Sequence, residues 1–330
     1  MNRNRKYNAE TGWVAIINPN AGRKKAAQDR NKIHDLLLRS GLSFQWVLTT
    51  HREHAIALTT KFIKKGFRKF LVIGGDGTLN EVVNGIFFQK AVPSTEFLVG
   101  MIPVGTGNDW CRMFEIPVHY DEAVEILKQQ NIFLQDIARV EFHQGGKQKR
   151  RYFINVAGMG YDAEVAAKTN KDKEHGKGGP LLYLKNLFTS LLFYKHTNTK
   201  VVIDNQSEKP LTTRTFSMSI GICRYNGGGM MQLPSALPDD GLLNATLIKK
   251  IGKLTVLKEV KNLFDGSFVN HPKVLTFTGK SFKIDSSPPI NLEADGESLG
   301  HSPFYFEVIP AALHVVVGKS SFTNHNQVLR

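Results

Sequence analysis

The first part of the chain alternates short apolar runs with longer segments in which apolar residues recur every three or four positions. Runs such as Trp13–Ile17 and Leu71–Ile73 are typical of strands buried on both faces, and the longer segments are typical of amphipathic helices. This alternation predicts a parallel sheet with helices on both of its faces. Further predicted strands are Ser43–Thr50 and a run from Phe97, and predicted helices include His51–Lys65 and Asp121–Gln130.

The pattern changes near Asp136, after which short apolar runs are separated by turn residues. Such spacing predicts an antiparallel sandwich or barrel, and we expect a mostly antiparallel β-sandwich. Two helices, Pro180–Lys195 and Gly252–Phe264, are expected to interrupt it, and the Lys- and Gly-rich segment Lys168–Gly179 is expected to be a loop. The predicted strands are Phe133–Phe142, Arg151–Val156, Lys200–Asp204, Thr215–Ile222, Leu243–Ile248, Val274–Thr278, Ser281–Asp285, Phe304–Val308 and Leu313–Val317.

These patterns divide the chain into three parts, and its 330 residues are enough for two hydrophobic cores. Residues 1–136 are predicted to form a Rossmann-like α/β domain, and residues 137–310 the β-sandwich. Residues 311–330 are predicted to supply a C-terminal strand and a tail that pack back on the first domain.

A glycine-rich turn, Gly74–Gly85, follows the predicted strand Leu71–Ile73 and leads into a predicted helix. Glycines let backbone N–H groups approach oxyanions, and a helix N-terminus favours negative charge, so this arrangement indicates a phosphate cradle. Asp76 would repel phosphate unless a divalent cation or a proton lay between them. The turn matches neither GxGxxG nor GxxxxGK[ST]. The alternative is a tight strand–helix turn with Asp76 or Thr78 as N-cap.

Two more glycine turns, Asn18–Gly22 and Val104–Asp109, also follow predicted strands. The carboxyl ends of parallel strands lie at one edge of a sheet, where ligands bind in open α/β folds. We therefore expect the three turns to form one phosphate-binding edge.

The chain is basic, with a net charge of +14, and its 22% charged residues are ordinary for a globular protein. A basic balance suits a nucleotide, a nucleic acid or an anionic membrane surface. Without an RNP-like segment or zinc-finger spacing, we predict no nucleic-acid partner. Two cysteines, Cys111 and Cys223, are too few for a disulfide framework and fit a reducing cytosol. No signal peptide or membrane span is predicted, so we expect a cytoplasmic protein.

Five segments together resemble the diacylglycerol kinase catalytic-domain family, and more narrowly its soluble bacterial lipid kinases. The resemblance extends from Asn18 to about Gly318 and implies a first domain like those of phosphofructokinases and NAD kinases. The GGDGT turn alone is shared with those two groups, and the combination is more specific. The five segments are Gly74–Gly85, Pro103–Asp109, Ile154–Val165, Asn226–Leu243 and Asp295–Glu297.

The resemblance implies an ATP site on the glycine turns of the first domain. Its backbone-lining glycines would be Gly22, Gly74, Gly75 and Gly77, with Asp76 holding water or Mg²⁺ beside the transferred phosphoryl group. The remaining residues implied at this site are Asn18, Thr49, Thr78, Leu79, Asn80 and Thr106.

The resemblance also implies two further acids in catalysis. Glu297, in Asp-Gly-Glu, would accept the proton of the alcohol, with Asp76 as the rival base. Asp136 would join their network at the domain junction. From the sequence alone, Glu297 could equally be an exposed residue of a hairpin turn and Asp136 a solvated acid at a strand end. Glu293, just before this turn, has no assigned role. The main spatial expectation is that Glu297 faces the glycine turns across a shared groove.

The segment Pro238–Gly241 resembles the structural magnesium site of the family. The implied ligands are the Asp240 carboxylate and the backbone carbonyls of Leu237 and Leu242, a set that suits hydrated Mg²⁺. The family more often has Leu where Pro238 stands, and the alternative is an Asp-Asp-Gly turn without a metal.

The predicted function is an ATP- and Mg²⁺-dependent kinase of diacylglycerol or a related lipid alcohol, peripherally bound to the anionic inner face of the membrane. The helix Leu181–Phe193 is apolar around much of its circumference, so it either packs in a core or contacts an acyl chain or a membrane. Alternatives are a kinase of a soluble acceptor such as NAD, a sphingoid or ceramide-type lipid kinase, and a nucleotide-regulated membrane-binding module. The sequence leaves the oligomeric state undecided, with a homodimer as one option.

Overall fold

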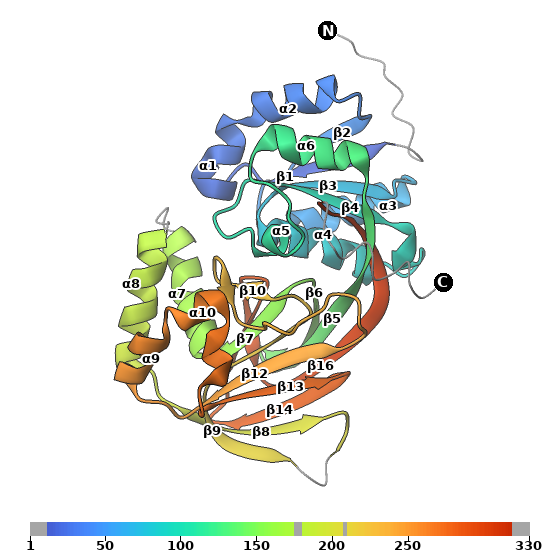
Figure 1. Ribbon diagram of the computed structural model, residues 1–330. Helices are drawn as coiled ribbons and strands as arrows, with labels where there is room; N and C mark the ends of the chain where they lie inside the picture. Colours follow the sequence, from blue (N-terminus) through green and yellow to red (C-terminus); the bar gives the residue numbers. More distant parts are fainter. Residues whose placement is uncertain (1–11, 175–179, 207–209, 319–330) are drawn as a thin grey trace. The chain divides into compact units, whose positions relative to one another are not determined.

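The computed structural model describes residues 12–174, 180–206 and 210–318, with side chains described there except for those of 173–184. The chain forms two compact units. The first consists of residues 1–135 and 311–330, and the second of residues 136–310. Figure 1 labels the helices and strands of both units.

The first unit is built on a parallel sheet in the order β2–β1–β3–β4, and the last residues of β16 pair with β4, also in parallel. Strand β1 is buried at all five positions, as expected of a central strand. The strands are β1 (Trp13–Ile17), β2 (Phe44–Leu48), β3 (Lys69–Gly74), β4 (Leu98–Pro103) and the end of β16 (Glu297–Val316).

Helices cover both faces of this sheet (Figure 1). Helices α2 and α6 lie on one face and α3 and α4 on the other, because the chain crosses from β1 outward to β2 and then back past β1 to β3. The helices are α1 (Ala21–Gln28), α2 (Arg30–Arg39), α3 (His54–Lys64), α4 (Asp76–Phe88), the 3₁₀ turn η1 (Ser94–Glu96), α5 (Asp109–Met113) and α6 (Tyr120–Gln129).

The second unit is antiparallel. Its strands pair in the order β13–β12–β9–β7–β15–β16, and β8 and β14 connect β9 back to β16. The single long strand β16 replaces the two shorter strands predicted at the C-terminal end. The strands are β5 (Ile132–Gln144, which begins in the first unit), β6 (Lys147–Phe153), β7 (Val156–Gly160), β8 (Thr197–Ile203), β9 (Leu211–Gly221), β10 (Tyr225–Asn226), β11 (Met230–Met231), β12 (Leu243–Lys249), β13 (Val274–Gly279), β14 (Ser281–Ser287) and β15 (Asn291–Ala294).

Four helices gather at one side of this unit (Figure 1), namely α7 (Tyr161–Glu174), α8 (Pro180–Phe193), α9 (Lys253–Glu259) and α10 (Asn262–Asp265), and the 3₁₀ turn η2 (Ser267–Asn270) follows them. Helix α7 occupies residues 168–174, so the expectation of a loop was wrong there; residues 175–179 lie outside the described residues. The predicted helix Gly252–Phe264 is divided into α9 and α10.

An α/β unit followed by a β-rich unit confirms the predicted fold class. Among the described residues, no helix is both long enough and apolar enough to cross a membrane.

Candidate functional site

Two glycine turns of the first unit lie directly against each other at the carboxyl ends of β3 and β4. The N–H groups of Val104 and Gly105 donate to the carbonyl of Gly74, over 2.7 and 3.1 Å. A Cβ on Gly105 would lie 2.7 Å from the Cα of Gly75, which is closer than any side chain can approach. The two backbones can therefore meet only because both positions are glycine.

The third turn, after β1, joins them through Asn18 and Gly22. The Asn18 amide donates to the Thr78 hydroxyl over 3.2 Å, which joins this turn to the start of α4. Gly22 has a φ of +59°, and a Cβ there would lie 2.1 Å from the carbonyl oxygen of Val104. The three glycine turns thus meet at one edge of the parallel sheet.

Replacing Gly22 with alanine is expected to weaken the binding of a phosphate-bearing ligand at these turns by roughly tenfold or more, because the turn must move away from Val104 and displaced binding groups are costly. Calorimetric titration with a nucleoside triphosphate would measure this. Gly145→Ala is a matched control, since Gly145 has the same φ of +59° with nothing within 4 Å of its Cβ position. Equal dissociation constants for the two variants would contradict the prediction.

Asp76 is held at the start of α4 by backbone donors from the neighbouring turn. Its carboxylate accepts hydrogen bonds from the N–H groups of Asp109, over 3.3 Å, and Trp110, over 3.2 Å. Burial raises the pKa of Asp76, and these hydrogen bonds oppose the rise. A Cβ on Gly107 would lie 3.3 Å from Asp76 Oδ2 and 3.4 Å from Asp109 Oδ2, so the two carboxylates border one small space.

Asp109 is a candidate residue that the sequence analysis did not single out, although it ends one of the motifs quoted there. Like charges held close together disfavour ionisation of both groups, and a cation between them removes that cost. The pair Asp76 and Asp109 is therefore suited to a hydrated divalent cation.

The other predicted nucleotide residues of the first unit have different surroundings. Thr49 lies just beyond β2 and lines a surface hollow together with Pro19, Asn20, Ala27, Arg30, Leu48 and Thr50. Thr106 is exposed on its turn, whereas Leu79 and Asn80 are fully buried within α4. Leu79 and Asn80 therefore support the turn from beneath.

In the second unit, Glu297 follows the tight Asp295–Gly296 turn between β15 and β16. The φ values of Asp295 and Gly296, 49° and 80°, are both positive, as in the two-residue turns of β-hairpins. The Asp295 carboxylate is buried and accepts the N–H groups of Ile154 and Asn155 over 2.9 and 3.0 Å. Glu297 is half-buried and pairs across the hairpin with Ala294. The hairpin is therefore firmly anchored beneath Glu297.

The structure gives Glu293, left unassigned by the sequence, a place beneath the same hairpin. Its carboxyl accepts hydrogen bonds from the N–H of Gly296, over 2.9 Å, and from the side-chain amide of Asn226, over 2.8 Å. Burial is the main cause that raises the pKa of Glu293 to about 8. Hydrogen bonds continue from Asn226 through Gln232 and Ser219 to Asp162. Glu293 therefore links the Glu297 hairpin to a buried polar network.

The pKa of Glu293 has a consequence for stability. Between its ordinary value of 4.5 and about 8, the folded protein binds a proton here that the unfolded chain releases, so stability falls as pH rises. The expected slope is about 1.4 kcal/mol per pH unit. Urea unfolding at pH 6.5, 7 and 7.5 should show a smaller slope for Glu293→Gln than for the wild type.

The matched control for this measurement is Glu122→Gln, on the exposed face of α6, which should keep the wild-type slope. Asp162, whose pKa burial raises to about 6, accounts for a similar slope at lower pH. Parallel curves for Glu293→Gln and the wild type above pH 6.5 would contradict a neutral Glu293.

Asp136 and the segment Pro238–Gly241 lie together within the second unit. The N–H of Gly241 donates to Asp136 Oδ2 over 2.7 Å, and the N–H of Asp136 donates to the carbonyl of Pro238 over 2.8 Å. Asp136 is only 1% exposed, so the alternative of a solvated acid was wrong. Asp240 is exposed, and its Oδ1 accepts the N–H of Leu242 over 2.9 Å.

Asp240 can fit a hydrated cation, since its carboxylate is open to solvent beside a loop fixed by Asp136. Partial burial is the main cause that raises its pKa, and the neighbouring Asp239 adds to the rise, so a bound cation would favour its charged form. Within the described part of the chain, no three His, Cys, Asp or Glu side chains cluster as a metal site. A cation here would depend on Asp240, backbone carbonyls and water.

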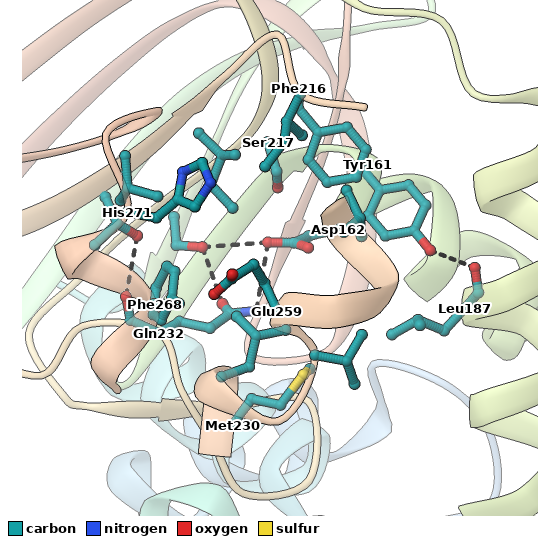
Figure 2. A pocket seen from close by; sticks show the side chains of 18 residues that line it. Tyr161, Asp162, Leu187, Phe216, Ser217, Met230, Gln232, Glu259, Phe268 and His271 are labelled. Carbon is teal, nitrogen blue, oxygen red and sulfur yellow. Dashed lines mark hydrogen bonds between the residues drawn. The ribbon is translucent and has the colours of Figure 1, made fainter. Parts of the chain in front are cut away.

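An apolar pocket with a polar floor lies in the second unit, between the sandwich and helices α7 to α10 (Figure 2). Asp162 and Gln232 form the floor together with Ser217, Ser219 and Thr246, and Glu259 and His271 are further polar side chains of the lining. The Tyr161 hydroxyl donates to the carbonyl of Leu187, which fixes α7 against α8. The apolar lining side chains are Leu187, Phe216, Met230, Ile248, Ile251, Val256, Val260, Leu263, Phe268 and Val274.

The structure therefore brings the predicted residues together in separate groups. The three glycine turns and Asp76 meet in the first unit, whereas Asp136 meets the Asp240 loop in the second. The expected approach of Glu297 to the glycine turns joins residues of different units and stays a prediction.

Comparison with known proteins assigns each half of the chain to a described domain. Residues 12–140 match the diacylglycerol kinase catalytic domain. Residues 155–317 match the YegS C-terminal NAD kinase beta sandwich-like domain. The chain is 28% identical to the diacylglycerol kinase of Staphylococcus haemolyticus over 93% of this chain and 88% of that protein. It is 27% identical to the diacylglycerol kinase of Mycobacterium tuberculosis over 93% and 96% of the two chains.

Solved structures show the same fold. A diacylglycerol kinase from Bacillus anthracis str. Sterne matches with a TM-score of 0.69 and 21% identity, over 94% of this chain and 97% of that one. A second solved chain from the same organism gives a TM-score of 0.73 and 23% identity, over 94% and 98%.

Proposed function

Because the chain belongs to the diacylglycerol kinase catalytic-domain family, and is therefore a kinase with an alcohol acceptor, we propose a specific reaction for it. In this proposal the protein, with Mg²⁺, transfers the γ-phosphoryl group of ATP to the hydroxyl of diacylglycerol or a related lipid alcohol. The observation that best supports a lipid acceptor is the pocket of the second unit, which combines an apolar wall with a small polar floor.

The glycine turns of the first unit hold the phosphates of ATP in this proposal. Closely packed glycine backbones at Gly22, Gly75 and Gly105 let N–H groups reach phosphate oxygens, and the start of α4 adds its favourable dipole. Asn18 and Thr78 hold the turns in register. The hollow lined by Thr49 would receive the nucleoside part of ATP.

Magnesium fits two sets of ligands. Asp76 and Asp109 would hold it beside the phosphates, and Asp240, with the carbonyls of Leu237 and Leu242, would hold a second ion that orders its loop. When bound beside ATP, Mg²⁺ neutralises charge that develops on the transferred phosphoryl group. Asp136 would keep the Asp240 loop in place through its hydrogen bond to Gly241.

Glu297 is proposed as the proton acceptor. The lipid hydroxyl loses its proton to the Glu297 carboxylate as its oxygen forms the new bond to phosphorus, and ADP leaves with the electron pair of the broken bond. Asp295 and Glu293 position the hairpin from beneath. The acyl chains would lie along the apolar pocket wall, with the polar glycerol part at Asp162 and Gln232.

The test is a kinase assay with labelled ATP, Mg²⁺ and a panel of acceptors in mixed micelles, including diacylglycerol, a sphingoid base, ceramide and free NAD. Transfer to diacylglycerol or another lipid alcohol is expected. The pocket should select among lipids, so Gln232→Leu is expected to raise the KM for the lipid and leave the KM for ATP unchanged. Transfer to NAD alone would overturn the proposal.

A further inference from the structure

Large apolar side chains are exposed on helices α8, α9 and α10 of the second unit. Leu254 and Leu257 of α9 are 76% and 42% exposed, and Phe264 of α10 is 55% exposed. At the end of α8, Leu192 and Phe193 are 61% and 81% exposed. We call these five residues, with Phe188 (43% exposed), the apolar patch. Monomeric globular proteins rarely leave such a group of side chains in water without a binding role.

The patch is not the core-facing side of these helices. The inner faces of α8 and α9 already share one hydrophobic cluster, in which Leu187 and Leu191 are buried and Val256 and Val260 pack against them. Around α9, Leu254 lies well away from Val256, and Leu257 lies between Leu254 and the direction of Val260, at the edge of the exposed side. Lys253 donates to the carbonyl of Leu192, so the end of α8 adjoins the start of α9. Each helix therefore packs one apolar side in this cluster and exposes further large apolar side chains beside it.

Positive charge surrounds the patch. The segment 249–265, through the end of α10, contains five lysines and two acids, Glu259 and Asp265, for a net charge of 5 − 2 = +3. Lys250, Lys258 and Lys261 are exposed, and Lys195 follows α8. A helix with apolar residues and lysines on its outer side matches the interface of an anionic bilayer, in which apolar side chains enter the acyl boundary and lysines meet headgroups.

We infer that the apolar patch is the surface through which this protein binds an anionic lipid bilayer. Helix α9 then separates the bilayer from the pocket, because Val256 and Val260 line the pocket while Leu254 and Leu257 face outward. This inference rests on the proposed function: a lipid acceptor would move past α9 from the bilayer into the pocket without crossing water.

The test is co-sedimentation of the full chain with vesicles of phosphatidylglycerol and phosphatidylcholine, and with vesicles of phosphatidylcholine alone. The wild type is expected to bind the anionic vesicles, more weakly at high salt. The triple variant Leu254→Ser, Leu257→Ser, Phe264→Ser is expected to lose at least tenfold in partitioning. Lys250→Gln, Lys258→Gln, Lys261→Gln is expected to lose binding mainly at low salt.

A matched control is Leu38→Ser, Phe88→Ser, Val118→Ser, which removes three exposed apolar side chains of the first unit and should bind as the wild type does. Thermal unfolding checks that the variants fold. Equal vesicle binding by the patch variant and the wild type would overturn the inference. So would a wild-type dimer in sedimentation velocity that becomes a monomer in the patch variant, because a second chain would then cover the patch.

Kinase activity separates this inference from the proposed function. The patch variant should keep its activity on a short-chain, water-soluble acceptor and lose it on acceptor in vesicles. A wild type that binds vesicles but phosphorylates no lipid would reject the proposed function alone. If the wild type and the patch variant phosphorylate lipid in vesicles equally well, the docking surface alone is rejected.

Discussion

Glu297→Gln is expected to lower kcat by about 10²–10⁴-fold, because glutamine cannot accept the proton of the attacking hydroxyl. The substitution keeps the size of the side chain. The hairpin should also keep its shape, since it depends on Asp295 and Glu293 rather than on Glu297. Pre-steady-state and steady-state rates with lipid acceptor would measure the loss, and the KM for ATP should change little.

The two variants together distinguish the candidate bases. If Glu297 is the base, Glu297→Gln retains only a low residual rate. If Asp76 is the base, Glu297→Gln keeps most of the wild-type rate and only Asp76→Asn loses it. Wild-type rates in Glu297→Gln would reject any chemical role for this residue. Ser298→Ala, at the next position of β16, is a local control that should retain activity.

Asp76→Asn is expected to lower kcat by roughly 10²–10³-fold, as is typical when a positioned electrostatic contribution is removed. The N–H groups of Asp109 and Trp110 bind different oxygens of Asp76, and asparagine can accept only one of them, so thermal unfolding is needed to check that the start of α4 remains folded. The missing charge should weaken binding of the cation that the proposed function places between Asp76 and Asp109. The variant is therefore also expected to need more Mg²⁺ for half-maximal activity.

Magnesium titrations of activity and of thermal stability would measure this effect. Asp109→Asn should shift the Mg²⁺ dependence in the same direction if the two carboxylates hold one ion, and Glu96→Gln, on the exposed turn η1, should not. An unchanged Mg²⁺ requirement in both aspartate variants would show that they bind no common cation.

Local features of the fold were predictable from the sequence, whereas features that depend on contacts between distant residues were not. The strand, glycine turn and helix around Asp76 were predictable because backbone freedom and apolar spacing act within a few residues. The hairpin at Asp295–Gly296 was predictable for the same reason. Helix α7 was not predictable in this way. Its second half is polar, and its first half is held by the contact of Tyr161 with Leu187, 26 residues away.

Whether a single apolar side chain is buried or exposed depended on tertiary contacts. The sequence left the apolar helix 181–193 undecided between core packing and an outer surface. The structure divides its described residues, with Leu187 and Leu191 buried and Phe188, Leu192 and Phe193 exposed. Periodicity cannot show this when both faces of a helix are apolar.

The sequence by itself determined the order of the two units, the glycine positions of the three turns and the acids of the motifs, because each follows from local geometry and residue chemistry. The tertiary structure decided which of those groups meet. It paired Asp76 with Asp109, placed Asp136 on the Asp240 loop and buried Glu293 against Asn226, 67 residues away. Burial and hydrogen bonds between distant strands set the charge of such groups, and they exist only once the chain has folded.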